Sequence, residues 1–182
     1  MRSRLEAKKS DVVIRAATLQ DAAALAEIHV SAWRAAYRGH MPDAVLDGLS
    51  VEKRTSDWQQ WLSEPGQGTT LVAEDGAELR AFCVFGPSRD DDAREQPIGE
   101  ILAINVHPEF WRHGYGATLC EAVLLAAQQR QWVALTLWML KSNRRADLFY
   151  RSLGFTPDGE ERLDTHTAGA TINEERYRRK FS

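Results

Sequence analysis

One stretch of the chain, residues 100–130, changes from a strand pattern to a helix pattern across two closely spaced glycines. Residues 100–106 are rich in Ile, Leu and Val, and Pro108 ends this strand pattern. Gly114 and Gly116 follow within a few residues. Apolar residues then recur at helical spacing, at Ala117, Cys120, Val123, Leu124 and Ala127. The sequence therefore predicts a strand, a short turn and a helix in direct succession, which constrains the fold more than any other stretch.

The start of this predicted helix is suited to an anion. Glycine lets the backbone approach a ligand closely. The first N–H groups of a helix have no partner inside the helix, and they lie at the positive end of its dipole. A phosphate or diphosphate fits such a position, and the neighbouring Arg112 and His113 could add positive charge.

Two other phosphate-binding motifs are excluded. A P-loop requires a glycine, four residues and then Gly-Lys-Ser/Thr, and the chain has no such run. A dinucleotide fingerprint requires a third glycine where this chain has Leu119, and an acidic residue at the end of the next strand. That strand ends in the apolar residues 138–140, so the second requirement also fails.

The string around the two glycines resembles the diphosphate motif of the GNAT superfamily of N-acetyltransferases. In that family, Arg/Gln-x-x-Gly-x-Gly/Ala follows a strand that ends in Val-x-Pro. Residues 106–108 match the strand end, and Gly114 and Gly116 match the glycines. Trp111 stands at the first position, where the family usually has Arg or Gln.

A second block of the same family is a strand followed by Asn and then by Phe-Tyr on a helix. Residues 135–140, Asn143 and residues 149–155 match this block in the expected order. The resemblance implies the GNAT fold, an α/β structure with a mixed central sheet of about seven strands flanked by helices and a splayed gap between strands 4 and 5. The hairpin signal at Asp75-Gly76 independently indicates a mixed sheet.

Composition sets the remaining bounds. We expect a polar, flexible segment at residues 1–10 and a single domain at residues 11–182. The net charge of −3 does not indicate a nucleic-acid surface. Cys83 and Cys120 are read as buried thiols in a reducing compartment, and no apolar run is long enough for a membrane span or a signal peptide. We therefore expect a cytoplasmic protein.

The resemblance implies acetyl-CoA as the cofactor, with its pantetheine arm in the gap between strands 4 and 5. Free backbone groups of Ile104 and Val106 would pair with the arm, and the glycine turn would hold the diphosphate. The residues that the resemblance assigns to the cofactor are Ile104, Val106, Arg112, His113, Gly114, Tyr115, Gly116, Ala117 and Asn143. For Asn143, an N-cap role on the following helix is an alternative that can hold at the same time.

Acetyl transfer to an amine needs a base for the amine, donors for the oxyanion and a proton for the thiolate. Glu100 is the candidate base, because strand alternation puts it on the same side as Ile104 and Val106. The alternative is a solvated acid at the start of a strand. Tyr150, which matches the family's Tyr, is the candidate acid, since a phenol stays protonated at neutral pH. Its alternative is a core aromatic residue beside Phe149.

The acceptor side is less defined by the sequence. His29, Trp33 and Tyr37 recur every four residues, and by the resemblance they could line the acceptor pocket; ordinary packing is the alternative, above all for Trp33. We interpret Asp90–Asp92 as a solvated loop rather than a guide for cations. The scattered histidines suggest no metal site.

These observations lead to one functional hypothesis and one alternative. We expect an acetyl-CoA-dependent N-acetyltransferase that acts on a primary amine of a small molecule or of a protein or peptide, by direct attack in a ternary complex. The alternative is a non-catalytic acyl-CoA-binding sensor or regulatory module. Neither nucleic acid nor a membrane is an expected partner, and the resemblance makes a homodimer conceivable. The sequence leaves the acceptor, the acyl-chain preference and the oligomeric state open.

Overall fold

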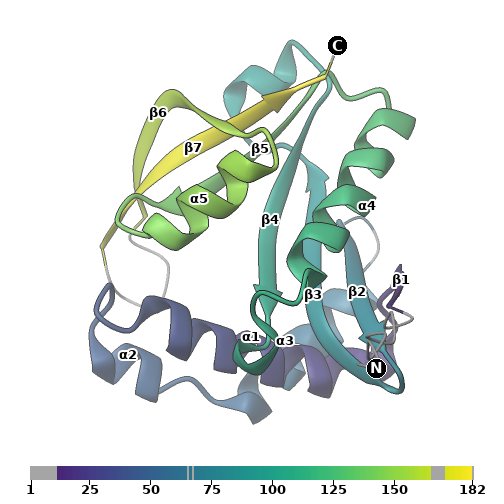
Figure 1. Cartoon of the computed structure of the whole chain (residues 1–182), viewed down its shortest axis with the longest axis vertical. Helices are drawn as coiled ribbons and strands as arrows, with labels where there is room; N and C mark the ends of the chain where they lie inside the picture. Colours follow the sequence, from purple (N-terminus) through teal and green to yellow (C-terminus); the bar gives the residue numbers. More distant parts are fainter. Residues whose placement is uncertain (1–11, 65, 67, 165–170, 182) are drawn as a thin grey trace, which may run out of the picture.

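The computed structural model describes residues 12–64, 66, 68–164 and 171–181, and within them the chain forms one seven-stranded sheet covered by helices (Figure 1). The strands lie in the order β1-β2-β3-β4-β5-β7-β6. Their bounds are β1 Val13–Ala16, β2 Thr69–Asp75, β3 Glu78–Pro87, β4 Ile98–Val106, β5 Ala134–Leu140, β6 Thr156–Asp164 and β7 Ile172–Lys180. All neighbouring strands are antiparallel except β4 and β5. The predicted mixed sheet of about seven strands is confirmed.

Five α-helices connect these strands. Their bounds are α1 Ala22–Tyr37, α2 Asp43–Asp47, α3 Val51–Ser63, α4 Tyr115–Gln129 and α5 Arg144–Ser152. Three short 3-10 turns accompany them, η1 Leu19–Asp21, η2 Asp91–Arg94 and η3 Pro108–Phe110. Among the described residues, no helix combines the length and the apolar character that crossing a membrane requires. The segment 1–10, which was predicted to be flexible, lies outside the described residues.

Local signals explain where the first helices begin. Thr18 and Asp21 form a capping box, in which the Asp21 carboxylate accepts hydrogen bonds from the Thr18 N–H at 2.7 Å and from its hydroxyl at 3.0 Å. Ser50 caps α3, because its hydroxyl oxygen accepts from the Lys53 N–H at 3.1 Å. These caps define where the helical segments begin, and apolar side chains of α1 and α3 pack against the same face of the sheet.

The sheet separates two layers of packing. One core cluster joins α4 and α5 to the sheet and includes Leu119, Val123, Tyr150 and both cysteines, which are fully buried. A second cluster joins α1 and α3 to the other face, around Phe82 and Trp58. The two cysteines carry no disulfide, and burial raises the pKa of the Cys120 thiol to about 12. Both cysteines are buried thiols, as predicted, and burial makes them unreactive.

The expected gap between strands 4 and 5 is present. The parallel ladder joins only residues 98–101 of β4 to residues 134–137 of β5. Beyond Ile101, β4 continues to Val106 in pairing with β3, and β5 continues to Leu140 in pairing with β7. The two strands therefore separate toward their C-terminal ends, where α4 and α5 begin (Figure 1).

A β-bulge in β4 corrects one expectation. Val84 pairs with Ala103, but the next residue of β3, Phe85, pairs with Ile101, so Leu102 is an extra residue in β4. Ile101 consequently packs in the same cluster as Ile104 and Val106, although an odd number of positions separates Ile101 from Ile104. Strict alternation is broken between Glu100 and these residues. The expectation that Glu100 shares their side was wrong, and it faces the side of α1.

Candidate active site

The N-terminus of α4 has the backbone geometry that the glycine pattern predicts. Gly114 is the N-cap residue and adopts a left-handed conformation, with φ 91° and ψ −11°. Arg112, two residues earlier, also has a positive φ of 68°. Within the described chain, no group accepts a hydrogen bond from the N–H of Tyr115, Gly116 or Ala117. These donors are available to an anion in front of the helix.

Gly116 is required for close packing at this point. A Cβ atom on Gly116 would lie 3.3 Å from Cζ of Phe149 and 3.4 Å from Cγ2 of Val106. The first turn of α4 therefore sits tightly between the end of β4 and α5. The two family blocks recognised in the sequence meet in space here, because Val106 belongs to the first block and Phe149 to the second.

Trp111 binds the end of β4. Its indole Nε1 donates a hydrogen bond to the carbonyl oxygen of Val106 at 2.8 Å. From the sequence, backbone groups of Val106 are predicted to pair with pantetheine. The Val106 carbonyl oxygen already accepts this hydrogen bond from within the protein. The segment 102–106 has no strand partner on the β5 side among the described residues, so other groups of this segment, including those of Ile104, border the gap.

The side chains around the glycines have different surroundings. His113 is exposed, and its Nδ1 lies 3.0 Å from the carbonyl oxygen of Trp111. Tyr115 is buried, and its hydroxyl donates to Asp75 at 2.6 Å, which raises the pKa of Tyr115 and ties the start of α4 to the β2–β3 hairpin. The Tyr115 side chain is therefore structural, and only its N–H faces the candidate anion site.

Asn143 takes the N-cap position of α5. Its side-chain Oδ1 accepts a hydrogen bond from the Ala146 N–H at 3.1 Å. The cap uses the carbonyl oxygen and leaves the amide NH₂ without a described acceptor. The N-cap alternative is thus confirmed, and the remaining donor is free for a second contact.

Tyr150 is 8% exposed and packs against Phe149 and Phe155 in the α4–α5 core. Burial raises its pKa well above the ordinary value, with smaller contributions from Cys120, Cys83 and Tyr37. No described group accepts a hydrogen bond from its hydroxyl. The Tyr150 phenol is therefore protonated over the whole physiological range and has a proton to donate.

Glu100 has an ion-pair partner that the sequence did not indicate. Its side chain is 2% exposed, and Arg89 holds it through three hydrogen bonds. Oε2 accepts from the Arg89 N–H and from Nε, each at 3.1 Å, and Oε1 accepts from Nη2 at 2.7 Å. Glu100 is thus not a solvated acid at a strand start, which was the alternative reading. The fork of Arg89 fixes its orientation.

The loop between β3 and β4 is fastened over this face by ion pairs. Arg176, 8% exposed, donates to Asp90 at 3.1 Å, to Asp92 at 3.2 Å and to Asp158 at 2.9 Å. Arg178 pairs with the same Asp92 and Asp158. The expectation of a solvated loop at Asp90–Asp92 was therefore wrong for Asp90 and Asp92, because both bind arginines of β7.

The aromatic residues of α1 lie together as their spacing predicts. The ring of Trp33 lies 5.2 Å from that of His29 and 5.1 Å from that of Tyr37. Both ring nitrogens of His29 are buried without a described partner. Burial lowers the pKa of His29 to about 3, with a further lowering by Arg54, so the imidazole is neutral. Trp33 and Tyr37 also pack against a small apolar cluster at the end of β5.

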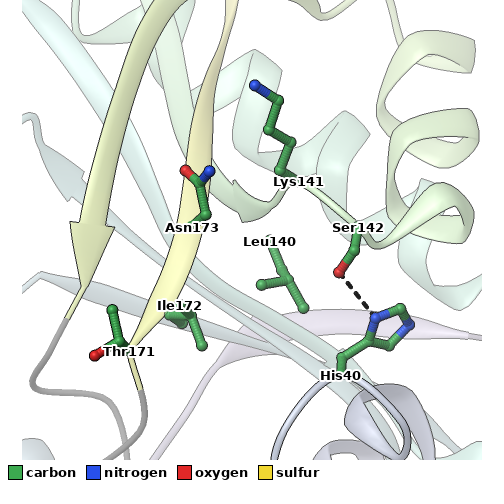
Figure 2. Close-up of a pocket in the computed structure, with 7 residues that line it drawn as sticks. All are labelled: His40, Leu140, Lys141, Ser142, Thr171, Ile172 and Asn173. Carbon is green, nitrogen blue, oxygen red and sulfur yellow. Dashed lines mark hydrogen bonds between the residues drawn. The ribbon is translucent and has the colours of Figure 1, made fainter.

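A cavity of about 390 Å³ opens beside that cluster (Figure 2). Leu140 and Ile172 form its apolar floor. His40 and Ser142 meet at its edge, where Nδ1 lies 2.9 Å from Oγ. Lys141, Thr171 and Asn173 complete the polar rim. The cavity thus lies at the end of β5, where this strand no longer pairs with β4.

The structure brings the predicted residues into two groups. The glycine turn of α4, the end of β4 and α5 form one group around the gap. Glu100 and the α1 aromatics lie on the opposite face, and Tyr37 is nevertheless within electrostatic range of Tyr150, whose pKa it raises. Sequence reasoning missed Arg89, since no local pattern connects it with Glu100.

Comparisons with known proteins agree with this geometry. The family model "Acetyltransferase (GNAT) family" matches residues 22–155. An uncharacterized N-acetyltransferase, YuaI of Bacillus subtilis (strain 168), is 25% identical over 163 residues, 90% of each chain. A probable N-acetyltransferase, Rv2775 of Mycobacterium tuberculosis, is 28% identical over 173 residues, 94% of this chain and 95% of the relative.

Solved structures share the fold. The crystal structure of PaiA N-acetyltransferase from Thermoplasma acidophilum, in complex with coenzyme A, has a TM-score of 0.71 at 18% identity. The match covers 94% of this chain and 99% of the PaiA chain. The family model extends over most of the chain, from the start of α1 to the residue before β6, and includes both blocks recognised in the sequence. The chain therefore belongs to the GNAT acetyltransferase family, and it is an N-acetyltransferase.

Proposed function

We propose that this protein transfers the acetyl group of acetyl-CoA to a primary amine of a small molecule, or of a protein or peptide, by direct attack while both substrates are bound. The observation that carries the proposal is the gap between β4 and β5, which leads to the open N-terminus of α4. The complex of PaiA with coenzyme A, in a similar fold, supports the choice of cofactor.

The described residues fit coenzyme A in three respects. The free N–H groups at the start of α4 suit a diphosphate, the absence of a side chain at Gly114 leaves open space before the helix, and Gly116 lets the first turn pack closely. Two basic residues, Arg112 and His113, directly precede these donors in the sequence. Asn143 caps the adjoining helix α5. Backbone groups of residues 102–106 border the gap and suit the amides of pantetheine. When bound, the thioester supplies an activated acetyl group.

Glu100 is the proposed base. A carboxylate has about four lone-pair positions, and Arg89 occupies three of them, so one position on Oε1 remains for the amine or for a water that relays its proton. The ion pair with Arg89 therefore orients the remaining lone pair of Oε1 and leaves it free to accept a proton. Because Glu100 faces the side of α1, the proposal requires the amine to enter from that face.

Tyr150 is the proposed acid. Its raised pKa keeps the phenol protonated, and it lies on the opposite side of the gap from α1. A proton donor there suits the sulfur of the leaving group. Base and acid thus lie on opposite faces of the sheet, and Glu100 is one residue before the point where the gap begins, so the proposal requires the reacting atoms to lie at the closed end of the gap.

The acceptor is proposed to bind between α1 and the end of β5. His29, Trp33 and Tyr37 would form one wall, and the cavity with the Leu140 and Ile172 floor would be its entrance (Figure 2). The aromatic wall favours the apolar part of an amine, and the polar rim favours hydrogen-bonding groups. We also infer a reducing, cytoplasmic setting from the buried free thiols.

An acceptor screen tests the proposed function. The purified chain is incubated with acetyl-CoA and a broad amine panel, and free thiol is measured. We expect thiol release above hydrolysis for at least one class of amine. A thermal-shift titration with acetyl-CoA runs in parallel, and Gly116→Glu should abolish the shift because its side chain cannot fit against Phe149 and Val106 without displacing the first turn of α4. Binding without thiol release across the panel would contradict transfer, and the lack of binding by any acyl-CoA would contradict the site.

A further inference from the structure

Arg145 of α5 lies directly over the ring of Trp111. The guanidinium carbon is 3.4 Å from the ring centroid, which is a stacked cation–π arrangement. Trp111 itself is fixed by its hydrogen bond to the Val106 carbonyl. The ring is therefore a rigid platform at the end of β4, and it holds the Arg145 head group beside the turn that precedes α4.

The charge around Arg145 is not neutralised. Within the described chain, neither Arg145 nor Arg112 forms an ion pair with a carboxylate. Burial lowers the pKa of Arg145, and the positive charge of Arg112 lowers it further, so the two guanidinium groups repel each other. Arg151 of the same helix, by contrast, is paired with Asp147. Two uncompensated cations within electrostatic range of each other form a positively charged patch that suits an anionic ligand.

Residue 111 is the first position of the diphosphate motif that ends in Gly114 and Gly116. Trp111 occupies this position and carries no charge. Stacking brings the guanidinium of Arg145 against the Trp111 ring, although Arg145 is 34 positions away in the sequence and belongs to another helix. A planar guanidinium that lies flat on a ring keeps its edge N–H groups free for phosphate oxygens.

We propose that Arg145, held on Trp111, is a phosphate-binding residue for coenzyme A and acts together with Arg112. The proposal rests on the proposed function, since it assumes coenzyme A as the ligand. The ligand chemistry is a phosphate group, either the diphosphate at the α4 turn or the 3′-phosphate of the same molecule. Arg145 thus supplies from α5 the charge that Trp111 does not carry.

The test compares Arg145→Ala with Arg144→Ala by isothermal titration with acetyl-CoA. Arg144 is the matched control, because it is the neighbouring arginine of α5 and is exposed like Arg145, but among the described residues only Arg145 stacks on Trp111. We expect the Kd to rise about 10-fold or more for Arg145→Ala, as for a lost charge-assisted hydrogen bond, and less than about threefold for Arg144→Ala. Arg145→Ala should also weaken the dependence of Kd on salt.

Two further binding measurements show which phosphate Arg145 contacts and whether the Trp111 ring holds Arg145 in place. If Arg145 binds the diphosphate, the loss is the same with 3′-dephospho-CoA; if it binds the 3′-phosphate, the loss disappears with that probe. Trp111→Leu should weaken binding as well, and the double variant should be no weaker than the poorer single variant, because stack and charge act as one unit.

The outcomes separate this inference from the function on which it rests. If Arg145→Ala and Arg144→Ala change the Kd equally while the unmodified chain binds acetyl-CoA, the proposed role of Arg145 is wrong but the proposed function stands. Failure of the unmodified chain to bind acetyl-CoA or coenzyme A would overturn the proposed function. Melting curves without ligand check that each variant is folded, and additive losses in the double variant would contradict the shared platform.

Discussion

The carboxylate of Glu100 is bound at both oxygens by the guanidinium of Arg89, although Glu100 is 2% exposed and Arg89 is 66% exposed. The pair therefore connects a buried point of β4 with the protein surface. Its backbone component, the Arg89 N–H donating to Oε2, also fixes the start of the β3–β4 loop. A carboxylate held in this way has a defined direction, which a base for an amine needs.

Glu100→Gln should lower turnover by about 100-fold, since general-base catalysis contributes roughly 10²–10⁴, and should leave the affinity for acetyl-CoA unchanged. The amide keeps a hydrogen bond from Arg89, so the fold should survive. The pH profile of kcat/KM decides the role, because loss of the base removes the limb at low pH. An unchanged turnover, or the same low-pH limb in the variant, would exclude Glu100 as the base.

Tyr150→Phe should reduce turnover, on the order of 100-fold if its proton is used in the rate-limiting step, with little change in acetyl-CoA affinity. Stability should change little, because the hydroxyl has no described acceptor. Tyr177→Phe is the matched control: its hydroxyl donates to Asp147 at 2.6 Å, so this variant should lose about 1 kcal/mol of stability and retain turnover. Equal turnover in all three proteins would remove Tyr150 from the mechanism.

Gly116→Ala should weaken acetyl-CoA binding, because the new methyl group meets Phe149 at 3.3 Å and Val106 at 3.4 Å. The contact with Phe149 is at the tip of a side chain, so Phe149→Leu in the same chain should restore much of the affinity. Titration calorimetry on the single and double variants measures this rescue. If the double variant binds no better than Gly116→Ala, the steric explanation is wrong.

His29 makes stability depend on pH. Its folded pKa, about 3, lies below the unfolded value of about 6.5, so the unfolded chain takes up the proton first as the pH falls. Stability is complete above pH 6.5 and should decline by about 1 kcal/mol per pH unit below pH 6. Urea unfolding at several pH values should show this slope in the unmodified chain and a smaller slope in His29→Leu. Parallel slopes in the two proteins would show that His29 is hydrated and titrates normally.

The sequence predicted what depends on neighbouring residues. Gly114, with its positive φ, and the apolar spacing that follows define the start of α4, and the Asp75-Gly76 turn defines the hairpin of β2 and β3. The caps at Thr18 and Ser50 were likewise visible. Each of these features depends on side chains a few positions apart, and local physical chemistry determines them.

The sequence could not predict what depends on distant partners. The bulge at Leu102 reverses the in–out alternation of β4 side chains from which the side of Glu100 was predicted. No residue type in this stretch indicates a bulge. Asp90 and Arg176 pair across 86 positions, so the acidic run looked like a solvated loop. Arg145 reaches Trp111 only because α5 folds back onto the end of β4. These relationships come from the packing of whole elements.

The four-residue ladder between β4 and β5 is the only strand pairing between the two halves of the sheet in the described chain. Few backbone hydrogen bonds therefore resist a hinge motion of strands β1–β4 against β5–β7. A ligand whose amides bond to both borders of the gap would act as a missing strand and couple the halves mechanically. Slower amide hydrogen exchange in β6, at the far edge of the sheet, would then accompany occupancy of a gap two strands away.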